Sequence, residues 1–370
     1  MLNGGTNLLE QFHVSETEAV RVNHNALRDT VAEIFEHVGV SNKDARQAAD
    51  VLVVADLRGV ETHGVSNMLR IYVGEYRSGQ INPRPNYEVI RETRATANMN
   101  SDGALGIIAT PHAMEIAIGK AKDVGVGMVT ISNGRHLGMA SYYPMMALKH
   151  DMIGICMTSC GPSVVPTYGA LPRLGTNPIA MAAPAGLQPP FVFDAATSSI
   201  AGNKIGLARR VGSPLSPGWL ASGDGTPIME EIEAPSGGHM PWLLPLGSTR
   251  EQGSHKGYGL ATIVDILSGI LSGGGYGMFP GRPHFHHMVA AYKVEAFCDV
   301  AGFKDMMDDF LCLLKATPPA PGHDKVLVAG QPEWEEEQQR RANGIPLHKE
   351  VVEWFREVCK EMNITYILED

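Results

Sequence analysis

The sequence predicts an α/β protein with more than one domain, and three observations support this class. The chain has 370 residues, of which 44% are hydrophobic and 19% are charged, so it can bury a large core. Apolar side chains recur at helical spacing in about the first eighty residues. From residue 88 to residue 275, short apolar runs alternate with glycine-rich turns and helical segments, which is typical of an α/β arrangement.

The N-terminal part is expected to be largely helical. A helix is predicted over residues 24–38 from the spacing of Leu27, Val31, Ile34, Phe35 and Val38. Ser41 followed by Asp44 matches a capping box and predicts the start of a second helix. Pro83 and Pro85 cannot continue a helix, because each lacks a backbone donor and forces its predecessor to be extended. We therefore expect a boundary near this point.

The middle of the chain carries the α/β pattern. Apolar runs at 126–131 and 152–157 predict strands, and helices are expected to open near Pro111 and Gly138. Residues 211–254 are rich in Gly, Pro and Ser, so we expect a long functional loop and not a folded unit.

The C-terminal part is expected to contain a strand after residue 285, a helix near 302–315 and a charged helix over 333–342. The expected division of the chain is therefore into three segments: 1–87, 88–275 and 276–370. No internal repeat or low-complexity tract is visible in the sequence.

Composition and charge exclude several classes of protein. The net charge is -10 and no block rich in Lys or Arg occurs, which argues against a nucleic-acid partner. The five cysteines show no paired spacing and are interpreted as reduced thiols in the cytoplasm. The N-terminus has no secretory pattern, and no apolar stretch approaches about 18 residues, so neither export nor a membrane span is expected.

The usual dinucleotide-binding fingerprint is absent from the sequence. No G-x-G-x-x-G motif follows a predicted strand. The cluster from Gly273 to Gly277 has the wrong spacing and follows a helix, so it is better explained as a flexible helix end. A Rossmann fold is therefore disfavoured.

One candidate catalytic group lies in the motif RGVETHG, which ends a predicted helix. His63 is flanked there by Thr62 and Gly64. An exposed histidine in such a turn can exchange a proton near neutral pH. A histidine that caps the helix or fills the core is the alternative, and the motif alone does not decide between them.

Three further motifs contain polar residues next to apolar runs. His136 lies in GRHLG, after a predicted strand and before a helix, where an anion can bind or where a simple turn can form. Thr176 lies in GTNP. Asp194 follows a predicted strand in FDAATS, where its carboxylate can either bind ribose hydroxyls or cap the next helix.

One lysine and one cluster of histidines each allow more than one interpretation. Lys256 lies at the start of a predicted helix, where it either contacts a phosphate or is simply exposed to solvent. The histidine cluster formed by His284, His286 and His287 includes no Cys, Asp or Glu that could complete a metal site. Alternate residues of a strand also point to opposite faces, so these histidines are not expected to converge on one ion. No metal site is predicted.

Taken together, these motifs resemble the malate/L-lactate dehydrogenase family, which also includes ureidoglycolate, sulfolactate and 2,3-diketogulonate enzymes and a cyclic ketimine reductase. The resemblance extends from about residue 22 to residue 356. It rests on VADLRGVETHG, SNGRHLG, the run from Val164 through GTNP, FDAATS, HKGYGLATIVDILSG, Pro321-Gly322 and GIPL.

The resemblance implies a nicotinamide-binding fold that is not Rossmann, with a discontinuous helical domain built from both chain ends, and it implies a homodimer. His63 is the implied proton donor or acceptor, with Thr62 in a supporting position. His136 would lie beside the nicotinamide and the substrate, and it is the rival acid/base.

The remaining site residues also follow from the resemblance. It assigns the cofactor, NAD or NADP, to Asp194, Ala195, Ala196, Lys256, Gly257, the loop around Gly330 and His136. Thr176 and Cys160 match positions on the substrate side, where Cys160 replaces a frequent Ser. Asn67 replaces a frequent Arg, so we expect Arg70, one helical turn further on, to bind the substrate carboxylate.

The expected reaction is the interconversion of a small 2-hydroxy acid and its 2-keto acid by hydride transfer. A neutral histidine suits the proton transfer, and an arginine fork suits the carboxylate. Two alternatives remain: an NADPH-dependent reductase of cyclic ketimine carboxylates, and a protein that binds NAD(P) without catalysis.

Overall fold

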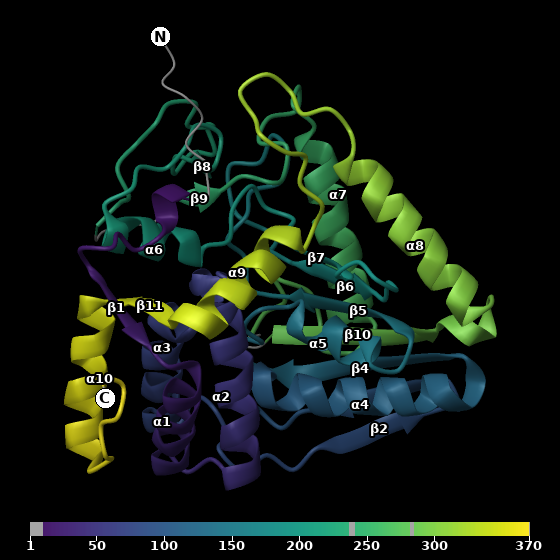
Figure 1. The fold of residues 1–370 in the computed structure, drawn as a ribbon, viewed down its shortest axis with the longest axis horizontal. Coiled ribbons are helices and arrows are strands. Elements are labelled where there is room, and N and C mark those ends of the chain that lie inside the picture. Colours follow the sequence, from purple (N-terminus) through teal and green to yellow (C-terminus); the bar gives the residue numbers. More distant parts are fainter. Residues whose placement is uncertain (1–9, 237–240, 282–284, 370) are drawn as a thin grey trace.

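The computed structural model describes residues 10–236, 241–281 and 285–369 (Figure 1). A mixed β-sheet with helices on both of its faces forms the larger part of the molecule. Helices from both ends of the chain form the rest. The predicted α/β class and the helical domain built from both chain ends are therefore confirmed.

The long helices are α1 (His24–His37), α2 (Asn42–Leu57), α3 (Val65–Arg77), α4 (Gly106–Val124), α5 (Tyr142–Leu148), α6 (Asn203–Val211), α7 (Ser254–Val264), α8 (Val300–Lys315), α9 (Gln331–Asn343) and α10 (Lys349–Met362). Short helical turns are η1 (Glu10–Phe12), η2 (Glu61–His63), η3 (Asp265–Ile270) and η4 (Val294–Ala296). The strands are β1 (Ala19–Val22), β2 (Glu88–Glu92), β3 (Thr96–Asn100), β4 (Val126–Gly134), β5 (Met152–Ser159), β6 (Ile179–Ala183), β7 (Phe191–Ala195), β8 (Leu220–Ala221), β9 (Trp242–Leu243), β10 (Phe285–Lys293) and β11 (Ile345–His348).

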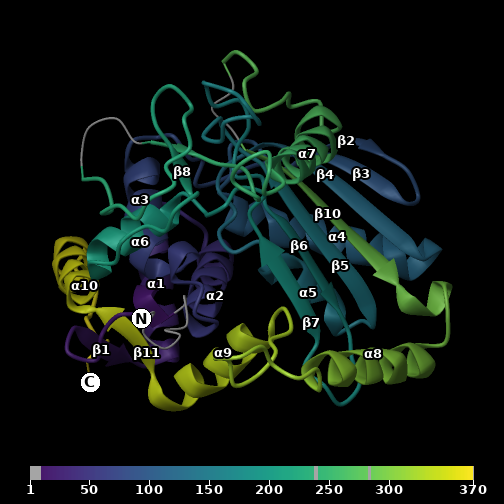
Figure 2. The same cartoon turned by 90° about the horizontal axis from the view of Figure 1, so that it is seen from above.

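The main sheet has seven strands in the order β2-β3-β4-β10-β5-β6-β7 (Figure 2). Strands β3 and β4 are parallel, and every other neighbouring pair in this sheet is antiparallel. The late strand β10 lies between β4 and β5, so the centre of the sheet forms only after a long part of the chain has been made. This order differs from that of a doubly wound parallel sheet.

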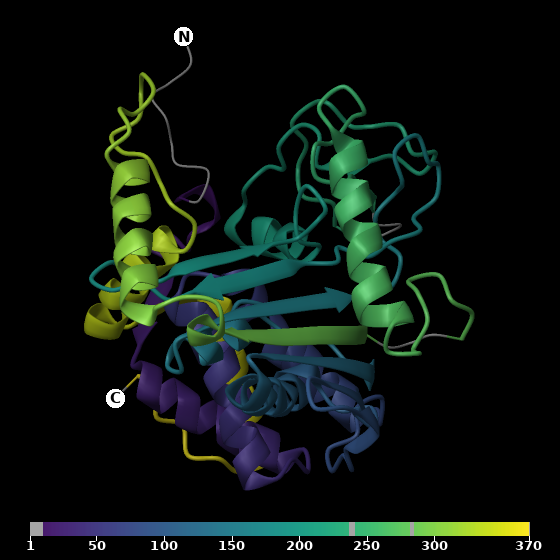
Figure 3. The same ribbon diagram turned by 90° about the vertical axis from the view of Figure 1, so that its right-hand side faces the viewer.

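Helices cover both faces of the main sheet. Figure 3 shows α4 below the sheet and α7 above it. Two strand glycines allow the lower helices to approach closely. A Cβ atom at Gly127 would lie 1.9 Å from the Ala117 carbonyl oxygen of α4, and one at Gly154 would lie 2.4 Å from the Pro144 carbonyl oxygen of α5. These glycines therefore fix the packing of α4 and α5 on the sheet.

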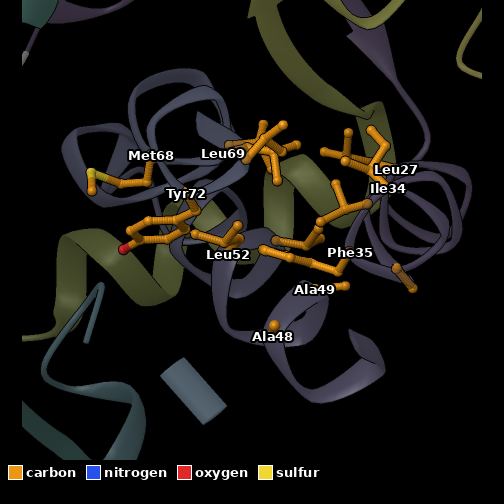
Figure 4. Close-up of a cluster of buried hydrophobic side chains, with 14 of the residues drawn as sticks. Leu27, Ile34, Phe35, Ala48, Ala49, Leu52, Met68, Leu69 and Tyr72 are labelled. Carbon is orange, nitrogen blue, oxygen red and sulfur yellow. The ribbon is translucent and has the colours of Figure 1, made fainter. Parts of the chain in front are cut away.

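The helical part has its own core, which both chain ends build (Figure 4). Leu27, Phe35 and Leu52 from the first two helices are fully buried, and they belong to the same cluster as Phe355 from α10. Strand β1 pairs with β11 in an antiparallel register that places Val22 opposite Ile345. The two ends of the chain are thus packed into one unit.

Local sequence signals explain several element boundaries. Ser41 caps the start of α2 as predicted, because its Oγ accepts the Asp44 N–H at 3.2 Å. The Asp44 carboxylate accepts from the Ser41 hydroxyl at 2.6 Å, whereas a full capping box would use the Ser41 backbone N–H. Helix α4 opens at Gly106, before the expected start near Pro111, and it tolerates Pro111 inside its early turns. In the part of the chain that the structure describes, no helix is long and apolar enough to cross a membrane.

The segment 211–254 was expected to be a loop without a folded core, and within the described residues this is wrong. Leu215, Leu220 and Leu243 are buried together with Ile205 and Leu207 of α6. Strands β8 and β9 pair within the segment. Scattered leucines and short strands supply this small core, and composition alone hides them because Gly, Pro and Ser dominate the count.

Candidate active site

A cavity of about 450 Å³ lies where the two parts of the molecule meet, and we call it the main cavity. Its wall combines the η2 turn, the start of α5, the end of β7, the start of α6 and the N-terminal residues Phe12 and His13. A smaller cavity of about 180 Å³ adjoins it and shares Asp194 and Glu333 with it. We call this one the side cavity.

Two histidines form a stacked pair at the main cavity. The rings of His63 and His136 are 5.5 Å apart between centroids and 12° from parallel. His63 lines the main cavity, whereas His136 is not among the described residues that line it. His63 Nδ1 lies 2.8 Å from the Thr62 hydroxyl, so this hydroxyl orients the ring.

The orientation of His136 is fixed from the other side. Its Nδ1 accepts the Gly138 N–H at 3.3 Å and lies 2.6 Å from the hydroxyl of the fully buried Tyr72. Because a backbone N–H can only donate, Nδ1 is the acceptor and the neutral ring carries its proton on Nε2. His136 is therefore set as a hydrogen-bond donor at Nε2.

Burial controls the charge of both rings. Desolvation lowers the pKa of His63 to about 4. Desolvation and then the neighbouring His63 and His287 lower the pKa of His136 to about 3. Both rings are neutral at pH 7, as a proton acceptor requires, but the pKa of His63 lies well below the neutral value expected from the sequence. The cause is the recessed position of the η2 turn.

The turn that carries His63 is held by a buried ion-pair network. Arg340 of α9 is 2% exposed. Its guanidinium donates to Glu61 Oε1 and to the Asp56 carbonyl oxygen, each at 2.7 Å, and to Glu336 Oε1 at 2.6 Å. The C-terminal helix α9 therefore fixes the turn between α2 and α3.

Asp56 supports the same turn from α2. Its Oδ2 accepts the Val65 N–H at 2.7 Å, and burial raises the pKa of Asp56 to about 8. A Cβ atom at Gly64 would lie 2.0 Å from Asp56 Oδ1, so only glycine fits between His63 and α3. The Gly64 of the sequence motif is explained by this close approach.

The end of β7 forms the acidic wall of the main cavity, with Asp194, Ala195 and Ala196. Asp194 Oδ2 accepts the Ser141 N–H at 2.7 Å, so it caps the start of α5 and not the helix that follows it in sequence. Asp194 is an exposed residue of β7. Desolvation raises the pKa of Asp194 to about 6, and the hydrogen bond from the Ser141 N–H opposes this shift.

Thr176 and Cys160 lie close together on the substrate side predicted from the sequence. Thr176 lines the main cavity, and Cys160 Sγ lies 3.5 Å behind its hydroxyl. Gly330 lines the side cavity with a φ of +85°. A Cβ atom there would lie 2.7 Å from the Val192 carbonyl oxygen, so the loop before α9 approaches β7 closely.

Two charged residues predicted for the site, Arg70 and Lys256, are exposed and do not line the main cavity. Arg70, expected to bind the substrate carboxylate, is half-exposed on α3, where its guanidinium lies 3.5 Å from Glu350 and over the Trp354 ring. The structure therefore does not support this role, because Arg70 and Asn67 lie on the same face of α3 and neither residue lines the main cavity. Lys256 is exposed on α7 and does not line the cavity.

Asn67 and Gly257 have structural contacts. Asn67 Oδ1 accepts from Arg210 Nη1 at 2.6 Å, and its amide lies 3.4 Å from the Asn203 carbonyl oxygen. Asn67 thus joins α3 to α6 behind the cavity wall. Gly257 packs against the backbone of Leu246, a residue that lines the main cavity.

Lys204 of α6 lines the main cavity, although the sequence did not predict it as a site residue. Its ammonium lies 4.5 Å from the Phe12 ring centroid and 5.6 Å from that of Trp219, and both aromatic residues also line the cavity. No sequence signal marks Lys204, because the same short helix carries Arg209 and Arg210. The fold distinguishes the three cations, because Lys204 lines the main cavity and Arg209 and Arg210 do not.

The histidines near β10 have structural partners. His287 lies 2.6 Å from the Thr158 hydroxyl, and His286 Nδ1 accepts the Asn133 N–H at 3.2 Å. His284 lies outside the described residues. Within the described ranges, no group of three His, Cys, Asp or Glu side chains could hold a metal ion.

Comparison with known proteins gives consistent results. A family model described as malate/L-lactate dehydrogenase matches residues 22–356. A malate dehydrogenase of Pyrococcus horikoshii is 37% identical over 363 residues, which cover 96% of this chain and 99% of that protein. An L-sulfolactate dehydrogenase of Methanocaldococcus jannaschii is 35% identical and covers 90% of this chain and 95% of its own.

Solved structures agree with these sequence matches. The malate dehydrogenase structure from Pyrococcus horikoshii OT3 superimposes with a TM-score of 0.87 at 36% identity and covers 96% of this chain and 99% of its own. The Δ1-piperideine-2-carboxylate reductase of Pseudomonas syringae has a TM-score of 0.76 at 23% identity, with 92% of this chain and 99% of that chain covered. The second match is a likeness of fold alone.

Proposed function

The chain belongs to the malate/L-lactate dehydrogenase family, and from this membership we propose that it interconverts a small 2-hydroxy acid and its 2-keto acid with NAD or NADP. It is an oxidoreductase. The observation that carries the proposal is the position of His63, which lines the main cavity as a neutral ring held by the Thr62 hydroxyl.

The hydrogen-bond acceptors of the two cavities suit the ribose hydroxyls of a nicotinamide dinucleotide. Asp194 and Glu333 line both cavities and offer carboxylate oxygens to ribose hydroxyls. Gly330 leaves room where any side chain would collide with Val192. We assign the cofactor to Asp194, Ala195, Ala196 and Gly330. When bound, the nicotinamide accepts a hydride from the hydroxy acid or donates one to the keto acid.

The residues of the chain handle the proton. In hydroxy acid oxidation, neutral His63 takes the proton of the substrate hydroxyl on its free ring nitrogen. In keto acid reduction, protonated His63 returns it to the oxygen. We place the acid/base at His63 and not at His136, because His136 lies behind the cavity and its Nδ1 is occupied by Tyr72 and Gly138. Thr176 and Cys160 would shape the substrate side.

Lys256 and Gly257 remain candidates for the cofactor phosphates on the basis of the motif alone. Lys256 is exposed at the start of α7, where a cation is unfavourable beside the helix dipole. A phosphate near this helix terminus would offset that cost. The predicted cytoplasmic location likewise rests on the cysteine pattern of the sequence.

We further propose that the enzyme is a homodimer. The apolar side chains of the helices between Leu27 and Val54 lie almost entirely inside the core of one chain, so they offer little surface to a partner. An exposed apolar stripe runs instead along α7 and η3, with Ile263, Ile266, Ile270 and Leu271 each 46% to 54% exposed. A second copy of the chain that packs on this stripe would remove it from water.

The decisive experiment is an assay of a panel of 2-keto acids and cyclic ketimine carboxylates with both NADH and NADPH. We expect turnover with at least one small 2-keto acid. Turnover with ketimines alone would instead show an imine reductase. Quenching of NAD(P)H fluorescence without turnover on any of these substrates would show a binding protein and would contradict the proposal.

A further inference from the structure

Lys204 is a cation of the main cavity without a counter-ion. Among the described residues, no carboxylate lies within ion-pair distance of its ammonium group, and burial lowers the pKa of Lys204. Its neighbours are the rings of Phe12 and Trp219. Arg58, another cation of the same wall, is paired with Glu337 at 3.1 Å. Lys204 is therefore the cation that a ligand could neutralise.

The aromatic neighbours hold the ammonium group in place without neutralising it. A cation over a ring face is stabilised by the ring, but by less than the loss of hydration costs when no anion is present. Phe12 reaches this position from the N-terminal turn η1, and Trp219 reaches it from the segment between α6 and β8. Two distant segments thus position one charged group inside the cavity.

The charges of the main cavity are separated. The carboxylates of Asp194 and Glu333 lie on the side that continues into the side cavity, and Lys204 lies on the α6 side with Phe12 and Trp219. Carboxylates suit ligand hydroxyls, and an ammonium suits a ligand anion. The acidic side thus matches the ribose hydroxyls of the cofactor, and the α6 side matches an acid group of the substrate.

The α6 side of the cavity also contacts the η2 turn, which carries His63. Asn203, the residue before Lys204, donates from its amide to the Thr62 carbonyl oxygen at 3.1 Å. The carboxylate and the reacting carbon of a 2-hydroxy acid are directly bonded. A group that holds this carboxylate must therefore lie near the proton-transfer group, as the α6 contact with the His63 turn provides.

We propose that Lys204, supported by the rings of Phe12 and Trp219, binds the carboxylate of the 2-hydroxy or 2-keto acid. This inference rests on the proposed function and assigns the role that the sequence had given to Arg70. It also accounts for the N-terminal turn in the cavity wall, because Phe12 is the ring nearer to the ammonium group.

The test combines kinetics with direct binding. Lys204→Met keeps the length and the apolar stem of the side chain but removes its charge. We expect the KM for the keto acid to rise roughly 10- to 100-fold, with a much smaller change in kcat, because a charge-assisted contact is lost. Lys204→Arg should recover part of this loss. Lys122→Met, on the exposed side of α4, is the matched control and should leave both constants unchanged.

Oxalate binding separates this inference from the proposed function. Isothermal titration with oxalate, without cofactor and with saturating NADH, needs no turnover. We expect the oxalate Kd to rise in Lys204→Met by a factor similar to that of the KM, while the NADH Kd stays within about twofold. A wild-type protein that binds oxalate through Lys204 but turns over no substrate would defeat the proposed function alone.

Two results would overturn the assignment of Lys204. One is oxalate binding that is equal in the wild type and in Lys204→Met. The other is a selective rise of the NADH or NADPH Kd, which would show that Lys204 contacts a cofactor phosphate. Phe12→Leu provides an independent check: the loss of one ring should weaken oxalate binding by a few-fold, whereas a purely structural ring would leave the Kd unchanged.

Discussion

At the scale of single residues, the two stacked histidines differ in what their rings face. His63 faces the main cavity beside the Thr62 hydroxyl, and His136 lies behind it with Nδ1 bound to Tyr72 and Gly138. A ring whose second nitrogen is held as a donor is suited to orient or to polarise, whereas a ring that faces the substrate is suited to exchange a proton.

Replacement of His63 by Asn should lower turnover by about 10² to 10⁴-fold while NAD(P)H affinity stays nearly unchanged. Asparagine keeps a polar side chain of similar volume but cannot exchange a proton at neutral pH. Steady-state kinetics and a fluorescence titration of NAD(P)H measure the two quantities. His136→Asn is the control. Near-normal turnover in His63→Asn together with lost turnover in His136→Asn would transfer the acid/base role to His136.

The pH dependence of kcat/KM should reflect the low pKa of His63. Oxidation needs the neutral ring, so its rate should be insensitive to this group near neutral pH and should fall as the pH drops through about 4. Reduction needs the protonated ring, so its rate should fall about tenfold per pH unit above about 4. Both limbs should vanish in His63→Asn. A limb near pH 6 that is lost only in Asp194→Asn would belong to Asp194.

The sequence predicted much of the candidate site, including Asp194, but not the cation Lys204. The residues His63, Thr62, Thr176 and Asp194, taken from motifs far apart in the chain, line one cavity. Lys204 could not be found, because a lone lysine in a helix with two arginines has no distinguishing spacing. Arg70 was placed by analogy with a neighbouring position. Residues 67 and 70 lie one turn apart on nearly the same face of α3, and this face contacts Arg210 and Glu350 instead of the main cavity.

At the scale of elements, helix α9 in the C-terminal part contacts the η2 turn, which carries His63. Its sequence contains charged residues on all sides, which predicts an exposed helix. Arg340 nevertheless points inward and binds Glu61 and the Asp56 backbone. The helix was predictable from its pattern, whereas the inward arginine depends on a partner that lies far away in the sequence and becomes visible only in the fold.

Loss of the Arg340 charge should destabilise the protein. Arg340→Met leaves the buried Glu61 carboxylate without its partner, and breaking a buried pair in this way costs about 3 to 5 kcal/mol. Urea unfolding measures this change, and turnover should fall because the η2 turn loosens. The exposed neighbour Arg341 is the matched control, and Arg341→Met should change the free energy of unfolding by only about 0.5 kcal/mol. Equal changes in the free energy of unfolding in both variants would contradict the idea that Arg340 holds the η2 turn.

At the scale of the whole molecule, the helix periodicity and the apolar runs predicted the α/β class, and the family resemblance supplied the discontinuous domain. No local signal predicts that β1 pairs with β11, because strand pairing between distant segments leaves no mark on either sequence. The position of β10 at the centre of the sheet was equally hidden.

The proposed dimer gives a prediction at the same scale. Ile266→Glu combined with Ile270→Glu places two charges on the apolar stripe of α7 and η3, so the wild-type dimer should become a monomer in sedimentation velocity at micromolar concentration. Leu313→Glu is the control, because Leu313 is also exposed but lies on α8. A wild-type monomer with full activity, or a double variant that stays dimeric, would contradict this interface.

The pairing of β1 with β11 also has a consequence for protein synthesis. The ribosome releases β1 before the main sheet and β11 after it, so the helical domain cannot close until β11 has been made. The sheet from β2 to β10 is available for folding earlier. A nascent chain that ended at residue 330, before α9, would keep every strand of the main sheet but would lack Arg340, which binds Glu61 of the η2 turn.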